Sequence, residues 1–184
     1  MPEELLVIHC SPTLAGLKTA SLFACTFADD REMRSCVRCW NRRLTGKGLR
    51  ILPLCFENGR ALIYVYRPAR LSRDLRHGTA CRLLRERGYP AGGTSERCII
   101  RLMKRLREQD EFPHEIGLFL GYPPEDVRGF IENETRNYKF TGYWKVYGDE
   151  ERSRALFDKF ERCTRCYLAS WACGTGVERL ALAV

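Results

Sequence analysis

The chain has 184 residues, of which 45% are hydrophobic and 29% are charged, and its formal net charge is +8. This composition is typical of a folded protein, and the length suits one well-buried core, so wholesale disorder is excluded. No apolar run approaches the roughly 20 residues that a membrane-spanning helix needs. The acidic start at Met1–Glu4 and the short apolar run from Leu5 to Ile8 are unlike a signal peptide. We therefore expect a cytoplasmic protein that does not bind a membrane.

The N-terminal part alternates short helical and strand patterns. We predict a short helix over Glu3–His9, a second helical turn opened by Ser11-Pro12, and a strand over Leu22–Phe27. Asp29-Asp30 then opens an amphipathic helix, whose apolar residues recur at helical spacing (Met33, Val37, Trp40 and Leu44).

The clearest local signal is a β-hairpin. Two strand-like runs, Arg50–Phe56 and Arg60–Arg67, are joined by a turn at Asn58-Gly59, a pair that suits positive φ angles. Pro53 lacks the N–H that a ladder needs, so we expect it at an edge or a bulge.

The middle and C-terminal parts are predicted to be mainly helical. We expect helices over Ser72–Arg87 and after Thr94 or Ser95, an aromatic strand over Tyr138–Tyr147, and a long helix from Asp149 to about Trp171. Val177–Val184 is expected to be a last strand or a tail. We find no repeat or linker, so these elements predict one α+β domain over residues 1–184, with a single mixed sheet that contains the hairpin and is flanked by helices.

The stretch from Phe112 to Val127 is the predicted wall of a site. Its sequence predicts a short apolar strand, a turn at Gly121-Tyr122-Pro123, and a helix that begins at Pro124 with acidic residues in its first turn. Strand-to-helix turns often hold ligands, so Tyr122 is a candidate ligand-binding residue.

Ten cysteines are many for this length. A secreted disulfide framework usually belongs to a smaller domain with an export signal, so we expect reduced thiols, several of them buried as small apolar side chains. Two Cys-x-x-Cys pairs, Cys36–Cys39 and Cys163–Cys166, resemble half-sites for zinc or iron–sulfur. Because both fall inside predicted helices, we favour core packing over metal binding and assign no metal ligand.

Cys10 is the predicted catalytic thiol. It precedes the expected helix start at Ser11-Pro12, where the helix dipole would stabilise a thiolate. His9 beside it and Lys18 further along the chain would lower its pKa more, and both are also candidate ligand-binding residues. His114 could serve as its base after folding. The alternatives are a buried thiol for Cys10 and a structural histidine for His114.

Positive charge gathers in residues 61–110, which contain 12 basic and 5 acidic side chains. Arg97 lies on a basic helix face that follows Gly92-Gly93, and Lys145 lies on one face of the aromatic strand, so both are candidate ligand-binding residues. Such a region attracts an acidic protein, RNA or a small anionic ligand. Nucleic acid is not favoured, since no RNA-binding signature accompanies the charge.

Three stretches together resemble an uncharacterised domain-of-unknown-function family of small cytoplasmic proteins from anaerobic, often gut-dwelling bacteria. They are His9–Lys18, His114–Val127 and Gly142–Asp149. The resemblance covers nearly the whole chain and implies a single-domain cytoplasmic protein. It implies no activity, cofactor or catalytic residue.

These observations favour a cytosolic thiol- or redox-related protein with a site around Cys10 and His114. One alternative is a non-enzymatic adaptor that binds an acidic partner, either a redox protein or RNA, through its arginine-rich middle third. Another is an iron- or haem-binding protein that uses His9, Cys10 or the Cys-x-x-Cys pairs. No cofactor is identified.

Overall fold

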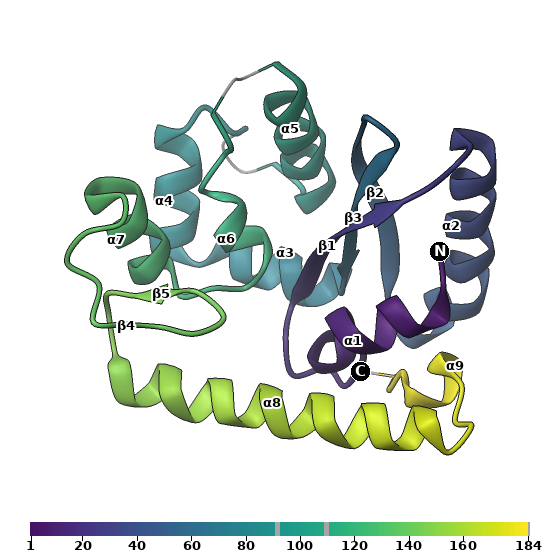
Figure 1. The fold of residues 1–184 in the computed structure, drawn as a ribbon. Coiled ribbons are helices and arrows are strands. Elements are labelled where there is room, and N and C mark those ends of the chain that lie inside the picture. The colour runs from purple at the N-terminus through teal and green to yellow at the C-terminus, as the bar shows by residue number, and fades with distance from the viewer. Residues whose placement is uncertain (91–92, 109–110, 184) are drawn as a thin grey trace. The chain divides into compact units, whose positions relative to one another are not determined.

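The computed structural model describes residues 1–90, 93–108 and 111–183. The chain divides into two compact units: a terminal unit, Met1–Ala69 with Phe160–Val184, and a middle unit, Arg70–Lys159 (Figure 1). A single domain over residues 1–184 stays a prediction. Gly92, of the Gly92-Gly93 pair that precedes the basic helix, lies outside the described residues.

A three-stranded antiparallel sheet forms the centre of the terminal unit. Its strands are β1 (Ala20–Thr26), β2 (Arg50–Glu57) and β3 (Arg60–Tyr66), in the order β1-β3-β2. The predicted hairpin is confirmed, with Asn58 and Gly59 at φ 47° and 72°. Pro53 lies on the edge strand β2 beside a register shift, as its missing N–H predicts.

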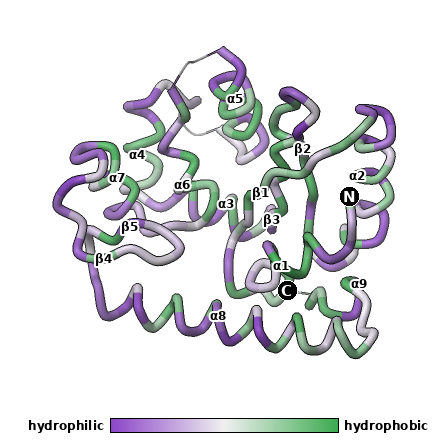
Figure 2. The backbone as a smooth tube through the Cα atoms, in the orientation of Figure 1, coloured by the Kyte–Doolittle hydropathy of each residue, from purple (hydrophilic) through white to green (hydrophobic). Residues whose placement is uncertain are grey.

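Helices pack on one face of this sheet, as the ribbon in Figure 1 shows. They are α1 (Glu3–Leu14), α2 (Asp30–Leu44) and α9 (Val177–Leu180), and the 3₁₀ turn η1 (Thr45–Lys47) follows α2. The strands that they cover are mostly hydrophobic in Figure 2. The shared core joins residues from the helices and strands: Leu6, Leu14, Phe23, Met33, Trp40, Ile51, Ile63, Val65 and Val177.

The predicted helix start at Ser11-Pro12 is wrong, because α1 runs through both residues. A proline inside a helix costs about 3 kcal/mol. Here the same helix buries Leu6, Val7 and Leu14 completely, and burying side chains of this kind returns about 1.5–3 kcal/mol each. Tertiary burial therefore outweighs the local signal.

The middle unit contains α3 (Pro68–Arg76, whose first two residues belong to the terminal unit), α4 (Gly78–Glu86), α5 (Ser95–Glu108), α6 (Ile116–Phe119) and α7 (Pro124–Asn133). The helix predicted over Ser72–Arg87 is therefore two helices. They separate at His77, whose φ of −57° and ψ of 134° are extended. The glycine that follows is a poor helix former, so the break costs little.

The apolar segment before Gly121 is a helical turn rather than the predicted strand. Backbone N–H groups of Ile116 and Leu118 donate to carbonyls three residues back, at 3.0 Å each, and Gly121 ends the turn at φ 76°. The segment is buried on all sides, and a short run that is apolar throughout has no periodicity to distinguish helix from strand.

The predicted aromatic strand is a small hairpin of β4 (Phe140–Thr141) and β5 (Lys145–Val146). The long helix is confirmed as α8 (Glu150–Ala172), along which hydrophobic and hydrophilic residues alternate in Figure 2. The segment after Gly176 forms the helical turn α9 rather than a strand. The predicted α+β class, with a β-hairpin in a sheet flanked by helices, is confirmed. Within the described residues, however, the strands form two separate sheets with antiparallel pairs rather than the predicted single mixed sheet, because β4 and β5 pair only with each other.

Candidate functional site

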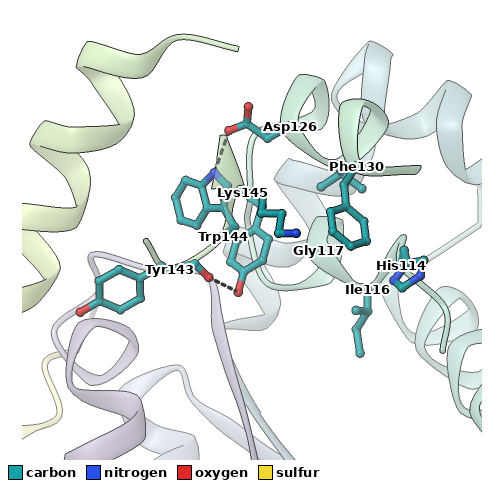
Figure 3. Close-up of a pocket in the computed structure, with 10 residues that line it drawn as sticks. His114, Ile116, Gly117, Asp126, Phe130, Tyr143, Trp144 and Lys145 are labelled. Carbon is teal, nitrogen blue, oxygen red and sulfur yellow. Dashed lines mark hydrogen bonds between the residues drawn. The ribbon is translucent and has the colours of Figure 1, made fainter. Parts of the chain in front are cut away.

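A cavity of about 200 Å³ lies in the middle unit among α6, α7 and the β4–β5 hairpin (Figure 3). Ten residues line it: His114, Ile116, Gly117, Tyr122, Asp126, Val127, Phe130, Tyr143, Trp144 and Lys145. The structure thus brings together three residues that the sequence singles out, namely His114, Tyr122 and Lys145. A concave apolar site with a few polar groups is the usual form of a small-molecule pocket.

Asp126 holds the hairpin against α7. Its Oδ2 accepts from Trp144 Nε1 at 2.7 Å, and its Oδ1 accepts from the N–H groups of Tyr147 and Gly148 at 2.8 and 2.7 Å. The side chain is buried, and it lies in the first turn of α7, where the helix dipole favours a negative charge. This carboxylate therefore supports the wall of the cavity.

Aromatic rings form part of that wall. Tyr122 stacks on Trp144 with centroids 4.6 Å apart, and Trp144 also meets the edge of Phe157 at 4.5 Å. The Tyr122 hydroxyl donates to the Tyr143 carbonyl at 3.3 Å, and burial raises the pKa of Tyr122 to about 12. Tyr122 is therefore a neutral phenol at physiological pH. Aromatic pairs of this kind make the wall rigid and apolar.

Two basic side chains face this wall. Lys145 Nζ lies 5.8 Å from the centre of the Phe130 ring and 4.9 Å from that of Tyr138. His114 meets Phe130 edge-on with centroids 4.8 Å apart, and Figure 3 shows both basic groups on the side of the cavity where Phe130 lies. Cation–π contacts orient the lysine without neutralising its charge.

Glu115 anchors the chain next to His114. It is fully buried, accepts a hydrogen bond from the Tyr89 hydroxyl at 2.8 Å, and forms an ion pair with Arg105 at 2.8 Å. Burial and this carboxylate raise the pKa of Tyr89. Adjacent His114 and Glu115 therefore have different roles: one lines the cavity and the other fixes α6.

The model of a family described as "Protein of unknown function (DUF3793)" matches residues 6–181. The chain belongs to this family. No curated protein and no solved structure matches it. The resemblance to a domain-of-unknown-function family is confirmed, whereas an origin in anaerobic bacteria stays a prediction.

In this DUF3793 chain, Cys10 is not at a helix start. It lies inside α1 with no exposed surface, and burial raises its pKa to about 12, although nearby Lys18 and a hydrogen bond with Ser21 act in the opposite direction. Burial likewise lowers the pKa of Lys18 to about 8. The predicted lowering of the Cys10 pKa is therefore wrong. Cys10 belongs to the terminal unit and His114 to the middle unit, so a site that they share stays a prediction.

The other candidates of the terminal unit are half-buried or exposed. His9 stacks on Phe23 with centroids 4.9 Å apart, and desolvation lowers its pKa. The Cys-x-x-Cys pairs lie within α2 and α8, as predicted. The predicted core packing fits Cys36 and Cys163, which are half-buried. It does not fit Cys39 and Cys166, which are exposed. Within the described ranges, no three His, Cys, Asp or Glu side chains are placed to hold a metal ion.

The arginine-rich helices have mixed roles. Arg97 is exposed on α5 and does not line the cavity. Arg105 is drawn inward, where it pairs with Glu115 and donates to the Arg87 carbonyl at 2.9 Å.

No helix in the described part of the chain is long and apolar enough to cross a membrane.

The sequence reasoning overlooked Phe130 and Gly117. Phe130 carries no local motif, and its part in the site depends on α7 packing beside the hairpin. Gly117 is required for close approach: a Cβ there would lie 2.8 Å from Val127 Cγ2 and 3.1 Å from Tyr122 Cδ2. An isolated glycine in an apolar run is the one signal that could have indicated it.

Proposed function

We propose that the middle unit is a binding module for a small aromatic molecule, which occupies the cavity among α6, α7 and the β4–β5 hairpin. The observation that carries this proposal is the lining, in which the rings of Tyr122, Phe130 and Trp144 border a hollow. His114 and Lys145 also line this hollow, whereas the ring of Tyr143 points away from it (Figure 3). Flat apolar walls favour a flat apolar ligand, and the few polar groups orient it.

The hydrogen bonding of Asp126 favours binding over acid–base chemistry at this carboxylate. A general base needs a lone pair directed at the substrate. Here both carboxylate oxygens accept hydrogen bonds from Trp144, Tyr147 and Gly148. We therefore assign Asp126 a structural role in a preformed pocket.

The experiment uses 4-fluorophenol as a neutral aromatic probe, observed by ¹⁹F NMR in the presence of the full chain. We expect saturable line broadening with the wild type and its loss with Phe130→Ala. Ile100→Ala is the matched control, because this side chain is 65% exposed and does not line the cavity. Equal broadening with Phe130→Ala and the wild type would overturn the proposal.

The thiol hypothesis for Cys10 stays a prediction. It has less support than ligand binding in the cavity, because the Cys10 thiol is buried and its pKa is raised. The ten cysteines are free thiols, which is compatible with the reducing cytoplasm that we propose for this protein.

A further inference from the structure

We infer that the ligand of this cavity carries a carboxylate that pairs with Lys145, so that the ligand class is an aryl or arylalkyl carboxylate. This inference rests on the proposed function and adds the charge of the ligand. It begins from the position of Lys145, whose side chain comes from β5 and lines the cavity (Figure 3).

Lys145 has a charge that the described residues do not neutralise. None of their carboxylates lies within 4.0 Å of its ammonium. Its contacts are the faces of Phe130 and Tyr138, which hold the stem and attract the cation but supply no counter-charge. A half-buried lysine beside apolar walls therefore favours an anionic group on the ligand.

The carboxylate that lines the same cavity, Asp126, is not available to Lys145. Its oxygens accept three hydrogen bonds, and it stands at the positive end of α7, so its charge is compensated on the protein side. His114 adds a second basic group that contacts Phe130. The polar groups left facing the ligand are therefore basic.

The same arrangement excludes a cationic ligand. Aromatic cages bind quaternary or primary ammonium groups by presenting ring faces to them. In this cavity Lys145 already occupies the face of Phe130, and a second cation would be repelled by it. A neutral aromatic molecule would fit the walls but leave the lysine unpaired.

The test compares three ¹⁹F probes with the same ring: 4-fluorophenylacetate, 4-fluorophenylacetamide and 4-fluorophenethylamine. At neutral pH and low salt, we expect the wild type to bind the acetate roughly tenfold more tightly than the amide, because a charge-assisted hydrogen bond is stronger than a neutral one. We expect the amine to bind most weakly. The preference for the acetate should shrink as salt is raised, since screening weakens a partly exposed ion pair.

Lys145→Met keeps the apolar stem and removes the charge, so it should bind the acetate and the amide equally. Lys145→Arg should retain the preference for the acetate, and Lys159→Met, at an exposed position of α8, should leave it unchanged. If the wild type binds the amide as tightly as the acetate, or if Lys145→Met keeps the preference, the inference is wrong while the pocket stands. If neither these probes nor 4-fluorophenol bind, the proposed function itself fails.

Discussion

Trp144 donates its indole N–H to the carboxylate of Asp126 over 2.7 Å, and this bond ties the β4–β5 hairpin to the first turn of α7. The two residues lie 18 positions apart and are both buried. The same carboxylate accepts two backbone N–H groups just after β5, so one side chain sets the position of the whole segment. The aromatic wall of the cavity depends on this arrangement.

Replacing Asp126 by alanine should therefore destabilise the middle unit. We expect the free energy of unfolding to fall by about 3 kcal/mol, because three donors lose a charged acceptor in a buried setting. Urea denaturation followed by fluorescence measures the change. Asp158→Ala, at an exposed position of α8, is the control and should stay within about 0.5 kcal/mol of the wild type. Equal midpoints for the two variants would show that the hydrogen bonds of Asp126 are dispensable.

Gly129 allows α7 to approach Tyr147 closely. A Cβ at this position would lie 2.4 Å from Tyr147 Cγ and 2.6 Å from its Cβ. Gly129→Ala should cost about 1–3 kcal/mol of stability, the usual range for overpacking. Gly78→Ala is the matched control, since nothing lies within 4 Å of the added methyl group, and it should be neutral or slightly stabilising. Thermal unfolding of both variants measures the difference in stability. If Gly129→Ala is as stable as Gly78→Ala, the close packing of α7 against Tyr147 is contradicted.

Arg67 joins distant segments of the terminal unit. Its buried guanidinium donates to the carbonyls of Thr13, Leu14, Lys47 and Leu182, at 2.7–3.1 Å. Arg67→Met should lower the free energy of unfolding by roughly 3–5 kcal/mol, because carbonyl oxygens lose their donor without gaining water. Arg67→Lys should recover part of the loss. The exposed Arg60→Met is the control in chemical denaturation, and a similar loss from Arg60→Met would show that general charge removal is responsible.

The accessible thiols should react before Cys10. Cys39, Cys166 and Cys173 are exposed, whereas Cys10 is fully buried. Brief treatment of the native protein with iodoacetamide at neutral pH, followed by mass spectrometry of peptides, should find label on the exposed cysteines and little on Cys10, because the thiolate is the reactive form. Early labelling of Cys10 would contradict its burial and support the thiol hypothesis.

The Cys10 thiol should also contribute to the alkaline pH dependence of stability. Its pKa rises from an ordinary value of 9.0 to about 12 in the folded protein, so the folded state holds this proton more tightly than the unfolded chain does. The resulting stabilisation is fully present below pH 9 and is lost as the pH rises toward 12. Cys10→Ala should therefore lose less stability across this interval than the wild type, as measured by denaturation at several pH values. Parallel curves would contradict the assignment.

Local chemistry in the sequence determined the elements whose signals act over a few residues. Asn58-Gly59 specifies a turn with positive φ, Pro53 excludes a regular interior strand, and Pro124 suits the first turn of α7. The α+β class follows from these signals and from the apolar periodicity of α2 and α8.

Tertiary structure decided the features that depend on burial. Pro12 lies inside a helix because the turn around it packs against the sheet, and the run before Gly121 is helical although its apolar pattern suits either state. The site has the same origin. His114, Tyr122 and Lys145 are visible as candidates in the sequence, but only folding brings them to one cavity, adds Phe130, and buries Cys10 where its thiol stays protonated. Desolvation and ring-to-ring contact arise between residues far apart in the chain, so no local pattern encodes them.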